Sequence, residues 1–235
     1  MDQFAPVRSN QDLITSKRRR RMKVGILGTG DVGKALGNGF LALGHSVMLA
    51  GREPNNAKAE EWLKKAASPG AKTGSFKDAA KFGDIVVLAT LGTATLEAMK
   101  MAGPENLNGK IVLDTTNPLD FSSGKPKLVG GLGDSAGEKH QKLAPQAHVV
   151  KVFNTVGNAL MFKPKLQGGP PTMFICGNDA GAKQKVTELC RDFGWETLDA
   201  GGIESSHYLE AMCLVWVLTA IKTGGWMQAF KMLRA

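Results

Sequence analysis

Residues 22–52, MKVGILGTGDVGKALGNGFLALGHSVMLAGR, decide the fold of this chain. The apolar run at 23–27 is short and ends at a glycine, as in a strand that is buried on both faces of a sheet. Apolar residues then recur at helical spacing until Gly44, where a helix would end, and a second apolar run follows at 45–50. This order of strand, tight turn, helix and strand predicts the first unit of a parallel sheet covered by helices.

The turn inside this segment carries Gly28, Gly30 and Gly33 in the spacing G-x-G-x-x-G. The first glycine permits the tight turn, the second lets the backbone approach a pyrophosphate, and the third lets the helix pack against the strand. The diphosphate would then lie against the unpaired amides of the helix N-terminus. Because the motif follows a predicted strand and opens a predicted helix, it indicates a dinucleotide site. The alternative is a tight turn that binds nothing.

The carboxyl end of the second predicted strand carries Gly51 and Arg52. An NAD-binding chain would place a carboxylate near this point to hold the adenosine ribose. A guanidinium instead matches a 2′-phosphate in charge and in planar geometry, so Arg52 predicts NADP as the cofactor. Asn55, Asn56 and Lys58 are further donors nearby. The alternative for Arg52 is a solvated side chain in a loop.

The rest of the chain alternates between apolar runs and helical patterns. Further strands are predicted at 71–76, 84–90, 110–116, 148–154, 172–177 and 195–201. Further helices are predicted at 55–67, 77–82, 93–102, 135–143, 180–194 and 204–233. The alternation predicts an α/β fold, a Rossmann-type doubly wound and mostly parallel sheet over residues 22–155. Residues 156–235 are expected to form a smaller C-terminal α/β region that ends in a long helix.

Residues 1–21 are predicted to be a disordered basic leader. The chain has 235 residues and a net charge of +9, of which this leader carries +4, from six basic and two acidic side chains. Its run of five basic residues at 17–21 could be a nuclear signal, a nucleic-acid contact, a solvated tail or an extension upstream of a start at Met22. No aromatic stacking platform accompanies the run, so no nucleic-acid partner is expected.

Cysteine content and hydropathy restrict the compartment. Cys176, Cys190 and Cys213 are too few and too scattered for a disulfide framework or a metal site, which predicts a reducing, cytoplasmic setting and no metal. The longest strongly apolar run, residues 211–221, is shorter than the ~20 residues that a membrane-spanning helix needs. No membrane partner is expected, and this run is predicted to be core or dimer interface.

No catalytic acid or base is predicted. Tyr208 is the single tyrosine, and the residue four positions later is Met212 rather than lysine, which excludes the tyrosine–lysine pair of short-chain dehydrogenases. No aspartate–histidine pair stands out in the sequence. Hydride transfer between a nicotinamide and a flavin-like ring needs only stacking at about 3–3.5 Å and the correct faces. The sequence therefore favours transfer between two redox cofactors.

Several stretches, in this order, resemble coenzyme F420-dependent NADP oxidoreductases and the cytosolic reductase domain of metalloreductases. They lie at 22–53, 84–90, 149–161, 173–202 and 205–221, and KVFNT (151–155) together with CGND (176–179) is the most specific combination. The resemblance implies homodimers formed through the C-terminal region and no obligatory catalytic acid. It also implies a small-molecule redox cofactor as the second substrate.

The resemblance also assigns roles to individual residues. It implies that Thr29, Gly30, Asp31 and Val32 hold the pyrophosphate, and that Gly51 and Arg52 replace a serine–arginine pair at the 2′-phosphate. It implies that Thr90 and Leu91 lie beside the ribose and the nicotinamide. It also implies that Asn154, Thr155, Val156 and Gly157 lie where the nicotinamide meets the second ring. Two departures stand out: Asn56 replaces a lysine of archaeal members, and Asn117 with Pro118 replaces an apolar stretch near the second ring. Asn154 and Thr155 could instead satisfy backbone groups at a strand end.

The function expected from the sequence is hydride transfer between NADP(H) and coenzyme F420 or a flavin, FAD or FMN. One alternative is an NADPH-dependent reductase of a flavin–iron system or of a small carbonyl or imine. Another is an NADPH-binding sensor that turns nothing over. A deep apolar cleft facing the nicotinamide would favour an enzyme, and a sealed nicotinamide face would favour the sensor. Trp195, Trp216 and Trp226 are expected to serve packing.

Overall fold

The structure is a computed structural model that describes residues 21–131 and 133–234. The predicted leader lies, except for Arg21, outside the described residues. The strands are β1 (Lys23–Leu27), β2 (Ser46–Gly51), β3 (Ala71–Ser75), β4 (Ile85–Leu88), β5 (Ile111–Asp114), β6 (Leu119–Asp120), β7 (Lys127–Leu128), β8 (His148–Lys151), β9 (Thr172–Gly177) and β10 (Glu196–Asp199). The helices are α1 (Asp31–Ala42), α2 (Ala57–Ala66), α3 (Phe76–Phe82), α4 (Thr95–Ala102), α5 (Ala136–Leu143), α6 (Ala180–Asp192) and α7 (Ser206–Thr223).

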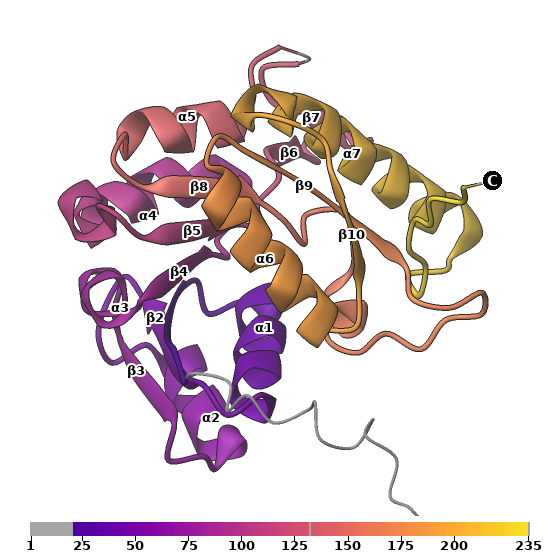
Figure 1. Cartoon of the computed structure of the whole chain (residues 1–235). Coiled ribbons are helices and arrows are strands. Elements are labelled where there is room, and N and C mark those ends of the chain that lie inside the picture. The colour runs from indigo at the N-terminus through magenta and orange to yellow at the C-terminus, as the bar shows by residue number, and fades with distance from the viewer. Residues whose placement is uncertain (1–20, 132, 235) are drawn as a thin grey trace, which may run out of the picture.

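An eight-stranded sheet in the order β10-β9-β8-β5-β4-β1-β2-β3 forms the centre of the molecule (Figure 1). Every neighbouring pair in it is parallel except β8 and β9, which are antiparallel. The strand order reverses direction between β1 and β4, and in such sheets ligands bind at the carboxyl ends of the strands at this switch point. The predicted α/β fold with a doubly wound, mostly parallel sheet is confirmed.

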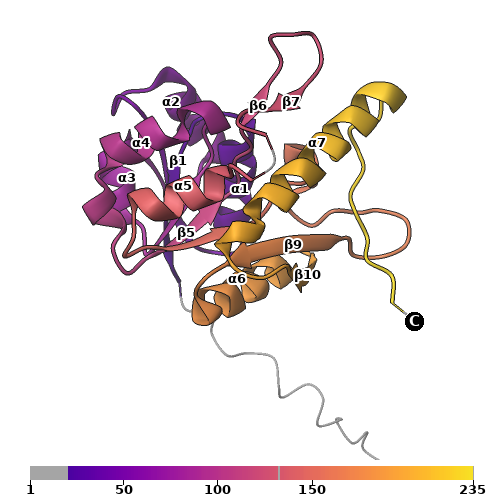
Figure 2. The ribbon, with the colours of Figure 1, turned by 90° about the horizontal axis from the view of Figure 1, so that it is seen from above.

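Helices cover both faces of the sheet, because alternate residues of each strand enter different cores. Val24 and Ile26 of β1 join the core under α1, α2 and α6, whereas Leu27 joins the core under α3, α4 and α5. The same alternation in β9 directs Phe174 to Leu209 of α7, on the face opposite to α6. Figure 2 shows α6 and α7 on the two sides of β9 and β10.

The last helix is shorter than predicted. Helix α7 ends at Thr223, not near residue 233, because Gly224 adopts a left-handed conformation (φ 69°) and so ends the helix. The chain then turns back along the sheet. Thr172 of β9 donates from its backbone nitrogen to the carbonyl oxygen of Phe230 at 2.9 Å, and the Trp216 indole donates to the carbonyl oxygen of Gln228 at 2.9 Å. The predicted helix at 204–233 is therefore correct only up to Thr223.

The glycine-rich stretch between β5 and α5, for which no strand was predicted, contains a short antiparallel hairpin, β6–β7. Leu119 pairs with Leu128 and Asp120 with Lys127, and an ion pair at 3.3 Å joins the side chains of the second pair. Figure 2 shows the hairpin projecting from the main body of the molecule. No helix in the described part of the chain has both the length and the apolar character to span a bilayer.

Candidate cofactor cleft and the charged network behind it

A cleft of about 1140 Å³ opens at the carboxyl ends of β1, β2, β4 and β5. It extends from the first turn of α1 and the loop after β2 to the segment after β5 and the β6–β7 hairpin. Of the predicted site residues, it brings together Gly28, Thr29, Gly30, Asp31, Val32, Gly51, Arg52, Asn56, Thr90, Leu91 and Asn117. These residues come from separate parts of the chain, and the switch point of the sheet explains why they meet.

The glycine turn packs closely against its neighbours and leaves open space at the N-terminus of α1. Gly28 has φ +136°, and a Cβ on it would lie 2.2 Å from the carbonyl oxygen of Ala89. A Cβ on Gly33 would lie 2.2 Å from the Gly28 carbonyl oxygen, so α1 packs directly against the turn. Gly30 faces open space, and no side chain caps α1 at this residue. The free amides of the first turn of α1 therefore face the cleft and suit an anion.

Arg52 lies at the rim of the cleft, exposed, with no hydrogen bond or ion pair to any described residue. Lys58 and Glu53 line the same end of the cleft. Asn56 begins α2, and its Oδ1 accepts from the backbone nitrogens of Lys58 (3.1 Å) and Ala59 (3.2 Å). This cap uses the oxygen of the amide and leaves its NH₂ group available at a cleft-lining position.

Gly51 and Asn56 fit together. A Cβ on Gly51 would lie 2.8 Å from the Cβ of Asn56 and 2.9 Å from its Nδ2. The Asn56 side chain thus occupies the space that a side chain at position 51 would need. The absence of a hydroxyl at position 51 and the presence of asparagine at position 56, which sequence analysis treated as separate departures, are one local arrangement.

The opposite end of the cleft is formed by hydroxyl, amide and apolar side chains. The ends of β4 and β5 are tied together, because Thr115 Oγ1 donates to the Leu88 carbonyl oxygen at 2.7 Å. Leu91 and Phe121 are 79% and 56% exposed although both are large apolar residues, and both line the cleft. Sequence analysis missed Thr115, Thr116, Leu119, Phe121 and Asn158 as lining residues.

The remaining predicted site residues, Pro118, Asn154, Thr155 and Val156, are buried and do not line the cleft. Asn154 lies directly behind it. Its Nδ2 donates to Oδ1 of Asn117 at 2.9 Å, and the Nδ2 of Asn117 donates to the Asn154 carbonyl oxygen at 2.8 Å. The expected contact of residues 154–156 with the nicotinamide therefore remains a prediction. Asn154 is connected to the cleft through its hydrogen bonds with Asn117, which lines it.

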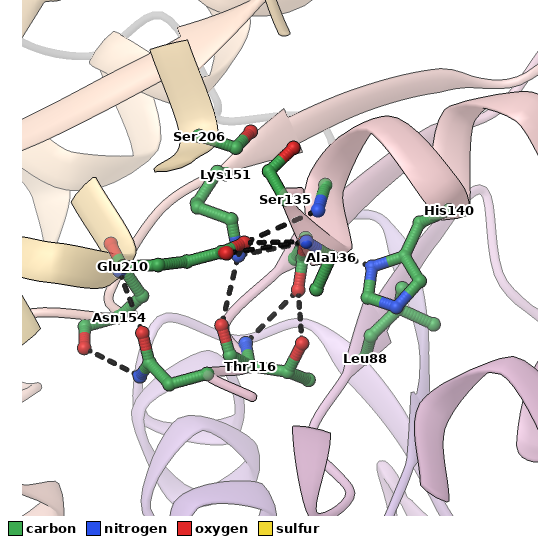
Figure 3. A network of polar contacts seen from close by, with 12 residues as sticks. Leu88, Thr116, Ser135, Ala136, His140, Lys151, Asn154, Ser206 and Glu210 are labelled. Atoms are coloured by element: carbon green, nitrogen blue, oxygen red, sulfur yellow. Dashed lines mark hydrogen bonds and ion pairs between the residues drawn. The ribbon is translucent and has the colours of Figure 1, made fainter. Parts of the chain in front are cut away.

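An aspartate–histidine pair that does not stand out in the sequence is present in the structure. Asp114 at the end of β5 and His140 of α5 lie 3.0 Å apart (Oδ2 to Nδ1), both fully buried (Figure 3). Lys151 of β8 joins Asp114 Oδ2 at 2.9 Å and Glu210 Oε1 of α7 at 3.0 Å. Glu210 also accepts from the backbone nitrogens of Ala136 (3.1 Å) and Gly137 (3.2 Å) at the start of α5. We call Asp114, His140, Lys151 and Glu210 the buried charge network.

Burial and charge act in opposite directions on these groups. Burial alone would raise the pKa of Asp114, but the Lys151 charge and the His140 contact outweigh it and hold that pKa well below its usual range. Burial alone would lower the pKa of Lys151, but Asp114 and Glu210 outweigh it and raise that pKa. Asp114 and Lys151 are therefore ionised at neutral pH. His140, 1% exposed, does not line the cleft, so the network supports the site from behind.

One signal in the sequence could have revealed this network. Lys151 stands in the middle of the apolar run HVVKVFN, which was correctly predicted to be a strand. A lysine inside a buried strand needs a buried partner, because an unpaired charge in the interior is very costly. The strand end LDTT carries the matching carboxylate. Glu210, in contrast, comes from a distant helix, and no spacing in the sequence points to it.

Comparison with known proteins agrees with this geometry. The model of the family "NADP oxidoreductase coenzyme F420-dependent" matches residues 23–118. The F420-dependent NADP reductase of Methanocaldococcus jannaschii is 33% identical over 201 residues, which cover 81% of this chain and 89% of that protein. A crystal structure named as a candidate F420-dependent NADP reductase, from Arthrobacter sp. FB24, has a TM-score of 0.85 at 36% identity, with 91% of this chain and 100% of that chain covered.

Metalloreductase STEAP3 of Rattus norvegicus is 30% identical over 194 residues. The match covers 82% of this chain but 36% of that protein, so this chain spans about a third of the metalloreductase.

The chain is an NADP-dependent oxidoreductase, as these relatives indicate. The cleft at the switch point agrees with this, because it has free α1 amides at one end and, at its rim, Arg52, which has no partner among the described residues. The chain belongs to the coenzyme F420-dependent NADP oxidoreductase family. The resemblance stated from the sequence is confirmed.

Proposed function

We propose that this protein transfers a hydride between NADP(H), held by the turn at Gly28–Gly30 and by Arg52, and a deazaflavin such as coenzyme F420. The observation that carries the proposal is the chemistry of the far end of the cleft. The residues after β4 and β5 that line it offer hydroxyl, amide and apolar groups, and no carboxylate, imidazole or amine is among them. Leu91 and Phe121 offer exposed apolar surface to a planar ring, and ring-to-ring hydride transfer needs no proton donor.

NADP rather than NAD is supported by the charge at the other end. Arg52 is exposed and has no partner among the described residues, and Lys58 adds a second positive charge at this end. A guanidinium can donate two parallel hydrogen bonds to a phosphate. Asn56 can add a neutral donor through its amide nitrogen. Glu53 is the carboxylate that follows Arg52, and NADH would have to rely on it for its ribose hydroxyls.

The test is to mix the protein with NADPH without oxygen and to offer coenzyme F420, FAD and FMN separately. Loss of the deazaflavin absorbance with matching loss of NADPH is expected. Reduction of FAD or FMN alone would overturn the deazaflavin assignment and support a flavin reductase instead. NADPH binding with no acceptor reduced would support a sensor. The variant Arg52→Ala serves as control, since it should slow any NADPH-dependent reduction at low NADPH.

We further propose that the protein is a homodimer in a reducing, cytoplasmic setting. Helix α7 buries Cys213, Trp216 and Val217, but Val215, Leu218 and Ile221 on its outer side are exposed. Trp226, expected to serve packing, is 51% exposed and contacts Trp216 with ring centroids 5.6 Å apart. Exposed apolar residues that lie together indicate an interface. Light scattering during gel filtration measures the mass, and a monomer at micromolar concentration would contradict the proposal.

A further inference from the structure

The segment that leaves β5, residues 114–117, forms the acceptor-side wall of the cleft, to which Thr115, Thr116 and Asn117 contribute. It has no regular secondary structure beyond Asp114, so its conformation depends on what holds it from behind. Two tethers do so, and both begin at the first turns of α7.

The first tether runs through Lys151. Its ammonium group contacts Glu210 of α7 (3.0 Å), Asp114 (2.9 Å) and the carbonyl oxygen of Thr116 (2.8 Å) (Figure 3). An ammonium group has three hydrogens, and these three acceptors use all of them. Asp114 then closes the turn, because its Oδ1 accepts from the backbone nitrogen (3.0 Å) and the hydroxyl (2.7 Å) of Thr116. The position of Thr116 is thus fixed relative to Glu210.

The second tether runs through Asn154. Its Nδ2 donates to the carbonyl oxygen of Leu209 in α7 (2.9 Å) and to Oδ1 of Asn117 (2.9 Å), which uses both amide hydrogens. Asn117 returns a hydrogen bond to the Asn154 backbone (2.8 Å). Leu209 and Glu210 are adjacent, so both tethers end at the same turn of α7.

The nucleotide end of the cleft has no such connection. Within the described residues, no hydrogen bond or ion pair joins α7 to the glycine turn at 28–32 or to the Arg52 loop at 51–58. A change in α7 would therefore move one end of the cleft and leave the other in place.

We propose that Lys151 and Asn154 are positioning residues that set the acceptor-side wall from the first turns of α7. Acceptor use, but not NADPH affinity, then depends on them. The inference rests on the proposed function in so far as it names an acceptor. Lys151 and Asn154 thereby connect the acceptor-side wall to α7, the helix whose outer apolar side chains are exposed.

The experiment uses two variants that cut the tethers by different means. Asn154→Leu keeps the branched shape of the side chain and removes both donors. Glu210→Gln keeps an acceptor oxygen and removes the charge that Lys151 contacts. For both, kcat/KM for the acceptor is expected to fall by about 10- to 100-fold, because a small misplacement of a reacting surface has an effect of this order. For Glu210→Gln, which lies outside the predicted cofactor site, the NADPH dissociation constant is expected to stay within about twofold of that of the unchanged protein, since no tether reaches the nucleotide end. For Asn154→Leu the loss of NADPH affinity is expected to be smaller than the loss in kcat/KM for the acceptor.

Leu189→Ala is the matched control, because it weakens the core under α6 on the other face of the sheet. It should leave kcat/KM for the acceptor nearly unchanged at a temperature where all variants are folded. An equal fall in the control, or NADPH binding that weakens as much as acceptor use, would show a merely structural role and overturn the inference.

Hydrogen exchange separates this inference from the proposed function. In both variants the hydrogen-bonded amides of Thr115, Thr116 and Leu119 should exchange faster. The amides of Gly28 and Lys34, which donate to the carbonyl oxygens of Ala50 and Gly30 (both 3.0 Å), should keep their protection. This readout needs no acceptor. If the unchanged protein reduces none of the acceptors, the proposed function fails, and the exchange pattern alone decides the tethers. Unchanged protection of Thr115, Thr116 and Leu119 would overturn them.

Discussion

The two ends of the cleft are built in different ways. The nucleotide end comes from one continuous part of the chain, residues 28–58, and its main features are backbone amides and exposed side chains. The acceptor end depends on Asp114, Lys151, Asn154 and Glu210, which come from different strands and a distant helix and are buried. A site formed by neighbours in sequence can be exposed and simple, whereas a wall built from distant residues needs a buried polar network to define its position.

The largest effect is expected from Lys151→Met at the buried end. Removing the ammonium leaves the Asp114 and Glu210 carboxylates buried without their partner, and breaking such a pair costs about 3–5 kcal/mol. Urea unfolding measures the change in the free energy of unfolding. The control is Lys185→Met, which removes the exposed pair with Glu188 in α6 and should cost less than about 0.5 kcal/mol. Equally small decreases in the free energy of unfolding for both variants would show that the buried ion pairs stabilise the fold no more than an exposed pair does.

At the exposed end, Arg52→Ala should weaken NADPH binding and leave stability unchanged. A charged hydrogen bond contributes about 1.5–3 kcal/mol, which corresponds to a 10- to 150-fold loss of NADPH affinity. NADH lacks the 2′-phosphate, so its affinity should hardly change. Titration calorimetry with both nucleotides measures the ratio. If both affinities fell equally, Arg52 would not be recognising the phosphate.

Acid should act on the buried end. The folded pKa of Asp114 lies below its unfolded value, so its contribution to stability is present above that value and is lost as the pH falls. The raised pKa of Lys151 lies far above the acid range, so the contribution of Lys151 to stability is fully present there. The free energy of unfolding should therefore decrease from about pH 5 downward, by up to about 1.4 kcal/mol per pH unit for this carboxylate. Asp114→Asn should flatten the slope. An unchanged slope in that variant would assign the acid sensitivity elsewhere.

The smallest effect is expected from Asn56→Ser. Serine caps a helix about as well as asparagine, so the melting temperature should stay nearly constant. The amide donor at the cleft is lost, which should weaken NADPH binding by about 0.5–1.5 kcal/mol. Asn56→Ala, which removes the cap as well, separates the two roles. If Asn56→Ser and the unchanged protein bound NADPH equally well, Asn56 would cap α2 but would not contribute to NADPH binding.

The sequence predicted the end of the cleft that is local. The glycine spacing, the strand before it and the arginine after the second strand all lie within residues 22–52, and short-range geometry is enough to connect them. The overall sheet was predictable for the same reason, because each strand and helix has its own periodicity. Phe121 was missed because it lies beside a hairpin of only two residue pairs, too short to give a pattern.

The buried charge network could not be predicted from spacing. Lys151 and Asp114 were visible as charges in or beside apolar strands, but their partners depend on which helix packs over them. Glu210 lies near the start of α7, directly before the run 211–221 that was predicted to be core or dimer interface. The end of α7 was missed for the opposite reason, since a local glycine at 224 overrode an apolar pattern that continued beyond it.

The antiparallel junction between β8 and β9 has a consequence for how the molecule unfolds. Only two residue pairs form this ladder, Val150 with Gly177 and Lys151 with Cys176, whereas the strand pairs beside it have four each. Such a junction would be a natural place for the sheet to separate. Lys151 lies in it and is bonded to Asp114 on one side and to Glu210 on the other. The Lys151–Glu210 pair therefore joins β8 to α7, and Leu209 of α7 packs on Phe174 of β9. Through this helix the two parts of the sheet, which backbone hydrogen bonds hold only weakly, are connected a second time.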